Sequence, residues 1–421
     1  MIQVTFCSHD SPDSLGGPYT WIQRLLPALR AHGIDPRCLF MTWGDSGPTL
    51  QRLRSMGFDC PAVPCHASTE DRVKWILTRL REDPPDVFVP NHVLAAYFAG
   101  RWARACGMPT VGVIHSPDDY HRAIQEEFIL GRTEFSLSAV VCVSGESERQ
   151  LLAEQPRHTK IYRIPCGVSV PTTRVKRTSS ALRLAYVGRL TEEAKRVSEV
   201  ARAFCRVTRN VPGTEALLYG DGPEKTKVEH ILATEGAGLP VRLAGRVDPD
   251  RIQEHLLDRD VIVLLSDYEG LPISLMEGMA CGCVPICLRI GGGVSELVED
   301  GVTGLLVDDR ADSFVAAIRR LKEEVGLWGR FSQAARAKIA NGYALDACAS
   351  QWAELLQCLH KSGGPKRAIE IPRQIKLPLP HPGLAGQDPR CSCPPLPVRL
   401  FRRTRMAAGR WRRRLLGQPV P

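Results

Sequence analysis

Two glutamates eight residues apart, Glu269 and Glu277, form the pattern in this 421-residue chain with the clearest chemical meaning. An apolar run at 261–265 precedes them, and Pro272 suits the first turn of a helix that Gly282 can end. The sequence thus predicts a strand, a turn that carries Glu269, and a helix that carries Glu277 in its second turn. A wholly helical separation of eight residues spans about 12 Å, about the reach from a hexose across a pyrophosphate to a ribose. With an anion site at the helix start, the two carboxylates fit a nucleotide sugar.

The neighbours of these glutamates carry a family resemblance. The donor half of the family 4 glycosyltransferases, which have the GT-B fold, closely resembles residues 268–285 (YEGLPISLMEGMACGCVP), 292–298 (GGVSELV) and 300–307 (DGVTGLLV). The resemblance implies that Glu269 faces the hydroxyls of the donor sugar and that Glu277 holds the ribose. The residues expected to line the donor site at the helix start are Gly270, Leu271, Pro272 and Ile273. Surface carboxylates on an ordinary amphipathic helix are the alternative.

Two cations follow another predicted strand. The sequence resembles the family here too, because the family has a Gly-Arg pair at a strand end with a lysine downstream. The matching residues are 186–190 (YVGRL), followed by Lys195. Arg189 offers a planar fork and Lys195 a mobile point charge. Both suit a pyrophosphate leaving group, which gains negative charge as the glycosidic bond breaks. The resemblance therefore implies that both bind the donor and assist catalysis, and an ordinary surface pair is the alternative.

In the first half of the chain, a glycine pair and a histidine follow predicted strands. The resemblance implies that Gly16 and Gly17, which lack side chains, let the backbone approach the donor phosphates, although a lone Gly-Gly pair is usually a turn. It also implies that His115, at the end of the strand 110–114, orients or stabilises the reacting centre. A hydrogen-bonded histidine that closes a strand is the alternative. Weaker candidates for acceptor contact are Asp118, Asp119, Asn91 and His92.

The sequence predicts no metal and no cofactor besides the donor substrate. Asp248-Pro249-Asp250 has the DxD form that holds a divalent cation in other glycosyltransferases, but it is better interpreted as a helix cap with a first-turn proline. The close cysteines 281, 283 and 287 have no second half of a zinc site. In a long chain without a secretion signal, the fifteen cysteines are expected to be buried free thiols.

The resemblance implies transfer of a sugar from a UDP- or GDP-linked donor to a hydroxyl acceptor, with retention of anomeric configuration, in glycan or glycolipid biosynthesis. Retention can arise through a covalent intermediate or through front-face attack within an ion pair, and the family favours the second route. A GT-B-fold isomerase or phosphorylase, or a catalytically silent nucleotide-sugar-binding module, is the alternative.

Alternating strands and helices predict an α/β chain with two facing doubly wound, Rossmann-like domains and an interdomain cleft. An acceptor-binding domain is expected at 1–170, a linker at 171–181 and a donor-binding domain at 182–345. A helix at 346–360 is expected to cross back to the first domain. The predicted strands are 2–7, 38–41, 87–89, 110–114, 140–143, 161–164, 182–187, 215–219, 241–244, 261–265, 284–288 and 305–307.

The basic charge of the chain lies in residues 361–421. The net charge is +9, and this tail holds 14 Lys and Arg against two acids, so the remainder carries a net charge of −3. The tail is expected to be disordered or peripheral to a membrane, because its Arg-rich part, 399–416, would gain about 1 kcal/mol per basic residue near an anionic lipid surface. A solvated tail is the alternative, and nucleic acid is a less favoured partner. Without a signal core or a membrane-spanning run of ~18 apolar residues, the protein is expected to be cytoplasmic, at or near the inner face of the membrane.

Overall fold

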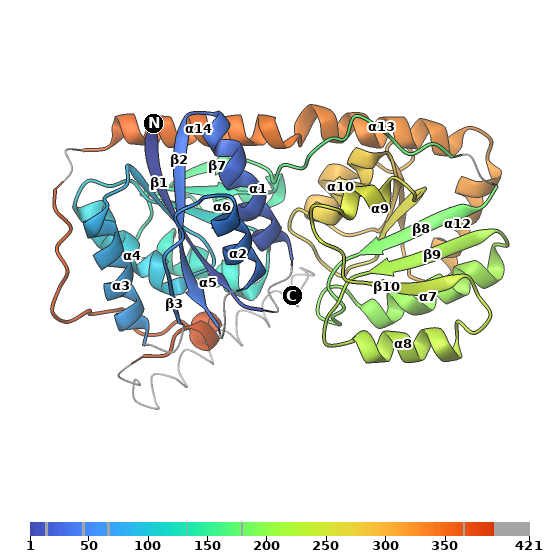
Figure 1. The fold of residues 1–421 in the computed structure, drawn as a ribbon, viewed down its shortest axis with the longest axis horizontal. Helices are drawn as coiled ribbons and strands as arrows, with labels where there is room; N and C mark the ends of the chain where they lie inside the picture. Colours follow the sequence, from blue (N-terminus) through green and yellow to red (C-terminus); the bar gives the residue numbers. More distant parts are fainter. Residues whose placement is uncertain are drawn as a thin grey trace.

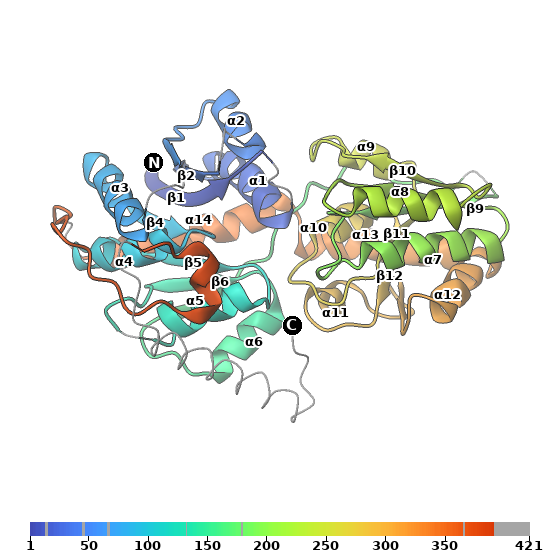
Figure 2. The ribbon, with the colours of Figure 1, turned by 90° about the horizontal axis from the view of Figure 1, so that it is seen from below.

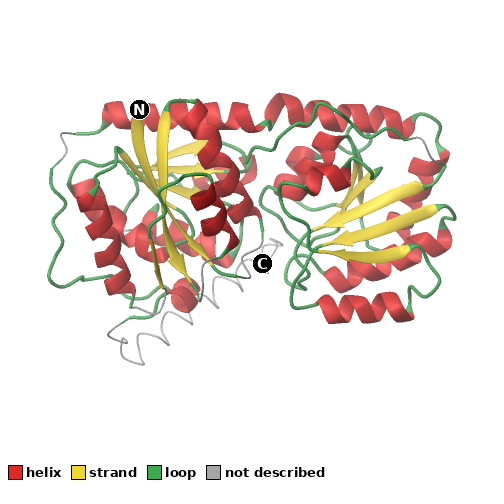
Figure 3. Ribbon diagram, viewed as in Figure 1, coloured by secondary structure: helices red, strands yellow, loops and turns green. Residues whose placement is uncertain are grey.

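The computed structural model describes residues 1–12, 16–43, 47–64, 68–131, 133–177, 180–364 and 367–390. Two α/β halves lie side by side, and helices α13 (Leu327–Gly342) and α14 (Leu345–Ser362) run along one side of both (Figure 1). Helices flank the sheets of each half (Figure 3). In the described part of the chain, no helix is long and apolar enough to cross a bilayer.

The first half is built on parallel strands in the orders β3-β2-β1-β4 and β5-β6-β7. A bridge between Phe88 and Thr110 joins the two groups. The strands are β1 (Ile2–Asp10), β2 (Ile34–Thr42), β3 (Ala62–Pro64), β4 (Val87–Pro90), β5 (Val111–Ile114), β6 (Ala139–Cys142) and β7 (Lys160–Arg163). The helices are α1 (Gly17–Ala31), α2 (Pro48–Ser55), α3 (Thr69–Glu82), α4 (Leu94–Ala105), α5 (Asp119–Phe128) and α6 (Gly145–Ala153). All residues of β4, β5 and β6 are buried, as continuous apolar runs in parallel sheets require.

The second half is one parallel sheet of order β10-β9-β8-β11-β12-β13. Its strands are β8 (Leu182–Val187), β9 (Thr214–Tyr219), β10 (Val241–Gly245), β11 (Val261–Leu264), β12 (Val284–Leu288) and β13 (Leu305–Val307). Its helices are α7 (Val197–Asn210), α8 (Lys225–Thr234), α9 (Ile252–Leu256), α10 (Ile273–Cys281), α11 (Gly293–Leu297) and α12 (Asp312–Glu323), with α13 behind α10. The strand order reverses between β8 and β11, so the loops after these two strands open at a topological switch point, where α/β sheets bind ligands.

The chain passes between the halves twice, and the two passages touch. The amide of Val168 donates to the carbonyl of Tyr343 at 3.0 Å, and the amide of Leu345 donates to the carbonyl of Val168 at 2.9 Å. Beyond this bridge, α14 returns to the first half, where fully buried Trp352 packs against Trp21 with 5.7 Å between ring centroids. The burial of such a large aromatic side chain ties α14 to the first half.

Residues 367–390, which we term the C-terminal segment, pack on the first half. Ile369, Ile375 and Leu384 are buried in its core, and a 3-10 helix, η1 (Pro382–Gln387), contacts α5 (Figure 2). The predicted disorder is therefore wrong for this segment, because its scattered apolar residues are buried against the first half. Its predicted place at a membrane surface stays a prediction. The predicted membrane-binding stretch 399–416 lies outside the described residues.

The cysteines of the described ranges are all free, and eleven of the twelve are buried. Cys358 on α14 is exposed, so the prediction of buried thiols is wrong at that position. The short strand β3 is not among the predicted strands, because three residues that end in a proline are too few for a strand pattern.

Candidate active site in the interdomain cleft

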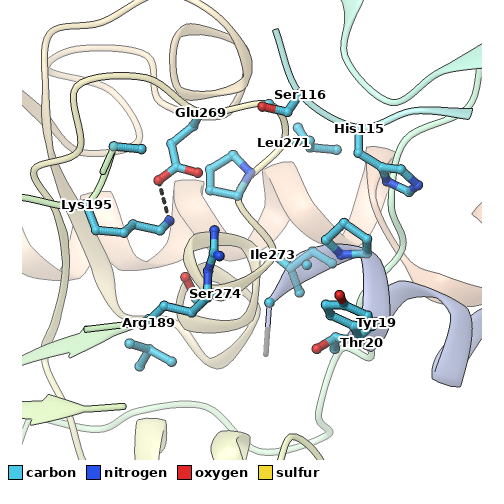
Figure 4. Close-up of a pocket in the computed structure, with 18 of the residues that line it drawn as sticks. Tyr19, Thr20, His115, Ser116, Arg189, Lys195, Glu269, Leu271, Ile273 and Ser274 are labelled. Atoms are coloured by element: carbon cyan, nitrogen blue, oxygen red, sulfur yellow. Dashed lines mark hydrogen bonds and ion pairs between the residues drawn. The ribbon is translucent and has the colours of Figure 1, made fainter. Parts of the chain in front are cut away.

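A cleft of about 590 Å³ lies between the halves and is lined by loops that follow the carboxyl ends of their strands (Figure 4). It brings together all the principal residues predicted from the sequence. These are Gly16, Gly17, His115, Arg189, Lys195, Glu269, Gly270, Leu271, Pro272, Ile273 and Glu277. His92, Asp118 and Asp119 also line it. Residues more than 250 positions apart in the chain thus share one site.

The loop between β11 and α10 forms one wall of the cleft. Pro272 is the N-cap of α10, and Gly282 ends this helix in the left-handed conformation at φ 92°, so the predicted strand, turn and helix are present. Glu269 lies in the turn and accepts a hydrogen bond from Lys195 Nζ at 2.5 Å (Figure 4). The side chains of Lys195 and Glu269 are only 14% and 12% exposed, respectively. The carboxylate and the ammonium are therefore held together beside the helix start, a pairing that sequence analysis did not predict.

Arg189 follows β8 and lies opposite the glycine pair. A Cβ atom at Gly16, whose φ is 125°, would lie 3.5 Å from Arg189 Nε. The main-chain carbonyl of Arg189 accepts a hydrogen bond from the Tyr186 hydroxyl at 2.9 Å, which anchors the backbone beneath the exposed guanidinium. Arg189 thus projects into the cleft from a fixed backbone.

Glu277 forms an ion pair that spans the two halves. Arg24 Nη2 on α1 donates to Glu277 Oε1 at 2.5 Å and also to the main-chain oxygen of Pro249 at 3.0 Å. The side chains of Arg24 and Glu277 are 14% and 5% exposed, respectively. Burial raises the pKa of Glu277, and the opposing attraction of Arg24 favours its ionised form. No local motif in the sequence marks Arg24, whose partner is 253 residues away.

The halves also touch through backbone. A Cβ atom at Gly270 would lie 1.9 Å from the main-chain oxygen of His115, so only glycine permits this approach. The Gly270 carbonyl accepts a hydrogen bond from the amide of Gly293 at 2.7 Å, which fixes the loop from the other side. A Cβ atom at Gly17 would lie 3.6 Å from the side chain of Ile273. The cleft is therefore in a closed arrangement, with the donor loop against the end of β5.

The first half contributes a group of histidines, defined here as His9, His92, His115 and His121. Their rings lie 4.7–6.0 Å apart in successive contacts, and His115 Nε2 pairs with the side-chain oxygen of Asn91 at 2.7 Å. Burial lowers the pKa of His9 to about 4 and lowers the pKa values of His92 and His115 well below their ordinary value. These three imidazoles are therefore neutral near pH 7. Two of these histidines were not predicted: His9, which lies near the carboxyl end of β1, and His121, which lies in the first turn of α5.

Asp118 caps α5 and holds one member of this group. Its carboxylate accepts hydrogen bonds from the backbone amide and from the ring Nδ1 of His121, each at 2.8 Å. Burial opposes ionisation of Asp118, but the charge and hydrogen bonds of His121 prevail and lower the pKa of the carboxyl to about 2. Asp118 is thus a negative group on the first-half side of the cleft.

The structure corrects the interpretation of Asp248 as a helix cap. Helix α9 begins at Ile252 after Arg251, while Asp248 accepts the amide of Asp250 at 2.9 Å and thereby closes the turn before the helix. Asp250 forms an ion pair with Arg52 of the first half. Within the described ranges, no group of three or more His, Cys, Asp or Glu side chains is arranged to hold a metal ion. Metal-independent catalysis remains a prediction.

Two family models match this chain. The model described as "Glycosyl transferases group 1" matches residues 175–338, and the model described as "Glycosyltransferase Family 4" matches residues 15–170. The first model thus matches the second half of the molecule, and the second model matches the first half.

Two curated relatives and one solved structure are similar to this chain. The alpha-D-kanosaminyltransferase of Streptomyces kanamyceticus is 30% identical over 40% of this chain and 43% of that protein. The N-acetyl-alpha-D-glucosaminyl L-malate synthase of Bacillus anthracis is 34% identical over 31% of this chain and 34% of that protein. The chain thus matches less than half the length of either relative. The crystal structure of Anabaena HepE in complex with UDP and glucose covers 85% of this chain and all of that chain, with a TM-score of 0.67 and 17% identity.

Proposed function

Because this chain belongs to the family 4 glycosyltransferases and has their GT-B fold, we propose that it transfers a sugar from a nucleoside diphosphate sugar to a hydroxyl group of an acceptor. We further propose that the donor carries UDP or GDP, that the anomeric configuration is retained, and that no metal takes part. The observation that supports this best is the convergence of eleven predicted donor-binding or catalytic residues from both halves on one cleft.

The donor would lie along the loop from β11 into α10. Glu277 would hold the ribose from inside this helix, and Glu269 in the turn before it would meet hydroxyls of the sugar. The pyrophosphate would lie between them, facing Arg189, Lys195 and the free amides at the start of α10. Lys195 is already paired with Glu269, so the same ammonium can orient the sugar-binding carboxylate and attract the adjacent phosphate.

The reaction would break the bond between the anomeric carbon and the diphosphate oxygen, and the electron pair would leave with the phosphate. The acceptor hydroxyl would attack from the same face, and its proton would pass to the departing phosphate oxygen. Arg189 and Lys195 favour this step because their positive charge interacts more strongly with the phosphate as it becomes more negative. Neutral His115 would act by orientation, since its pKa is held well below the ordinary value by burial.

A panel of UDP-, GDP- and ADP-sugars tests this function in two stages. Thermal shift with UDP, GDP and ADP should identify one nucleotide that stabilises the protein, because a ligand that binds only the folded state raises stability by mass action. The matching nucleotide sugars should then release nucleoside diphosphate, and transfer products should keep the donor's anomeric configuration. Binding without turnover would favour a silent module, and exchange with free phosphate would favour a phosphorylase.

A further inference from the structure

The C-terminal segment lies beyond the two matched family regions, which end at residue 338, yet it is built into the first half. Its far end is held by buried polar contacts. Asp388 pairs with Arg390 at 2.6 Å, and these side chains are only 1% and 7% exposed. Thr69 donates its hydroxyl to Asp388 and its amide to the Pro389 carbonyl, each at 2.7 Å. These buried contacts satisfy the charges of Asp388 and Arg390 and, through Thr69, anchor the end of the segment to the first half.

The 3-10 helix of this segment packs on α5, whose first turn enters the cleft. His381 at the start of η1 pairs with Glu126 of α5 at 3.0 Å. A Cβ atom at Gly383 would lie 2.9 Å from Cβ of Ala123, so a glycine is needed for this close packing. The same helix α5 presents Asp119, Tyr120 and His121 to the cleft. The segment therefore supports the helix that lines the first-half side of the site.

The last residue of η1, Gln387, lines the cleft directly. On this side of the cleft, the lining residues that the structure describes, from the first half and the C-terminal segment, include no Lys or Arg. They include Asp118 and Asp119, together with histidines that burial keeps neutral. The Tyr120 hydroxyl and Nε2 of His92 are buried without a hydrogen-bond partner. This side thus offers neutral donors and acceptors, and an anionic group on the acceptor would meet two carboxylates here, whereas the described lining cations lie on the donor side.

We propose that the C-terminal segment forms a wall of the acceptor site, where Gln387 hydrogen-bonds an uncharged, hydroxyl-rich acceptor such as a neutral sugar. The inference rests on the proposed function, since it assigns the side of the cleft opposite the donor loop. The carboxamide of Gln387 both donates and accepts, which suits a hydroxyl group that does the same. The segment is then a determinant of acceptor specificity that the matched family regions do not contain.

The test compares Gln387→Ala with Gln374→Ala, a matched change at an exposed glutamine of the same segment. The acceptor probes are methyl glucoside, methyl N-acetylglucosaminide and myo-inositol, each beside its monophosphate. Binding is followed by saturation-transfer NMR with UDP or GDP present, and transfer is followed with the active donor. We expect a neutral probe to be preferred over its phosphate. Gln387→Ala should raise its KM or Kd about three- to tenfold, the effect of one lost hydrogen bond, and Gln374→Ala should leave both constants unchanged.

A second variant, Gly383→Ala, tests whether the whole C-terminal segment, and not only the hydrogen bond of Gln387, shapes the acceptor site. It should push η1 off α5 and raise the acceptor KM by at least as much as Gln387→Ala, while the affinity for the nucleoside diphosphate changes less. The inference is overturned if no neutral probe binds, if the phosphates are preferred, or if the acceptor constants of Gln387→Ala equal those of Gln374→Ala. Failure of every nucleotide to bind the unaltered protein would instead overturn the proposed function.

Discussion

Replacing Arg24 by alanine should weaken nucleotide binding, although the guanidinium itself is paired with protein. Arg24 Nη2 lies 2.5 Å from Glu277 Oε1, and the carboxylate is 5% exposed, so the variant would leave a buried charge without its partner. Removal of one member of a buried pair typically costs about 3–5 kcal/mol. Because the two residues belong to different halves, the protein can avoid part of this cost by opening the cleft and hydrating Glu277. We therefore expect a smaller effect on binding, a rise in nucleotide Kd of about tenfold to a hundredfold, or ~1.4–2.8 kcal/mol.

Arg52→Ala is the matched control, because Arg52 and Asp250 also join the two halves. Their side chains are 35% and 43% exposed, and such surface pairs are worth about 0–1 kcal/mol. Isothermal titration calorimetry with the nucleotide that stabilises the protein should therefore show at most a fewfold change for Arg52→Ala. Small-angle scattering should show a larger radius of gyration for Arg24→Ala.

The pH dependence gives the Arg24 prediction a second readout. Burial raises the pKa of Glu277 and Arg24 counteracts this, so loss of Arg24 should raise that pKa further. A carboxyl whose pKa is raised in the closed state disfavours that state increasingly as pH rises through the raised pKa. The difference between Arg24→Ala and the unaltered protein should therefore be largest at neutral pH and shrink on acidification. An Arg24→Ala affinity equal to that of Arg52→Ala, or a defect that grows at low pH, would refute the reasoning.

Four further predictions concern the site and the tail. Glu269→Ala should mainly lower kcat and Glu277→Ala should mainly weaken nucleotide binding, each by about 1.5–3 kcal/mol, and unaltered kinetics in both would contradict their assignment. Arg189→Ala and Lys195→Ala should each reduce transfer at least about a hundredfold, whereas EDTA should leave transfer unchanged. Activity that is lost on addition of EDTA and restored by manganese would show a metal requirement. His9, His92 and His115 have lowered pKa values in the folded protein, but in the unfolded chain they take up protons near the ordinary pKa of about 6.5. The free energy of unfolding, measured in urea, should therefore fall as pH drops from 6.5 towards 4. A rise on acidification would contradict this. Deletion of 399–421 should reduce salt-sensitive co-sedimentation with acidic vesicles and leave transfer to a soluble acceptor intact, and equal binding of both forms would exclude a membrane role for these residues.

The strands and the cleft residues could be predicted because their signals are local. A buried parallel strand is a short apolar run, and residues just after such runs gather at one edge of the sheet. The partners of the site residues could not be predicted in this way. Lys195 and Glu269 are 74 positions apart, and Arg24 and Glu277 are 253 apart. A motif indicates which residues meet a substrate, whereas the residue that neutralises them depends on the tertiary fold and, for Glu277, on how the two domains dock.

The packing of the C-terminal segment also could not be predicted from the sequence. The segment has little regular structure, which its prolines explain, but composition alone does not reveal the surface that covers it. Ile369 and Leu384 are buried because the first half offers apolar surface beside α4 and α5. Fewer than one residue in five of this segment is a large aliphatic that becomes fully buried, which is too sparse for a periodic pattern.

The bridge between Val168 and Ala344 restricts how the two halves can move. Because both connections pass through one hydrogen-bonded point, and a Cβ atom at Gly167 would lie 2.6 Å from Cα of Leu345, the connections cannot slide past each other without losing these contacts. A rotation about that point, by contrast, needs changes in only a few backbone dihedral angles. The two walls of the cleft can therefore swing apart and together about this joint while its hydrogen bonds stay in place. Such a motion would let a charged donor enter from solvent and return each time to the same register of Gly270 against His115.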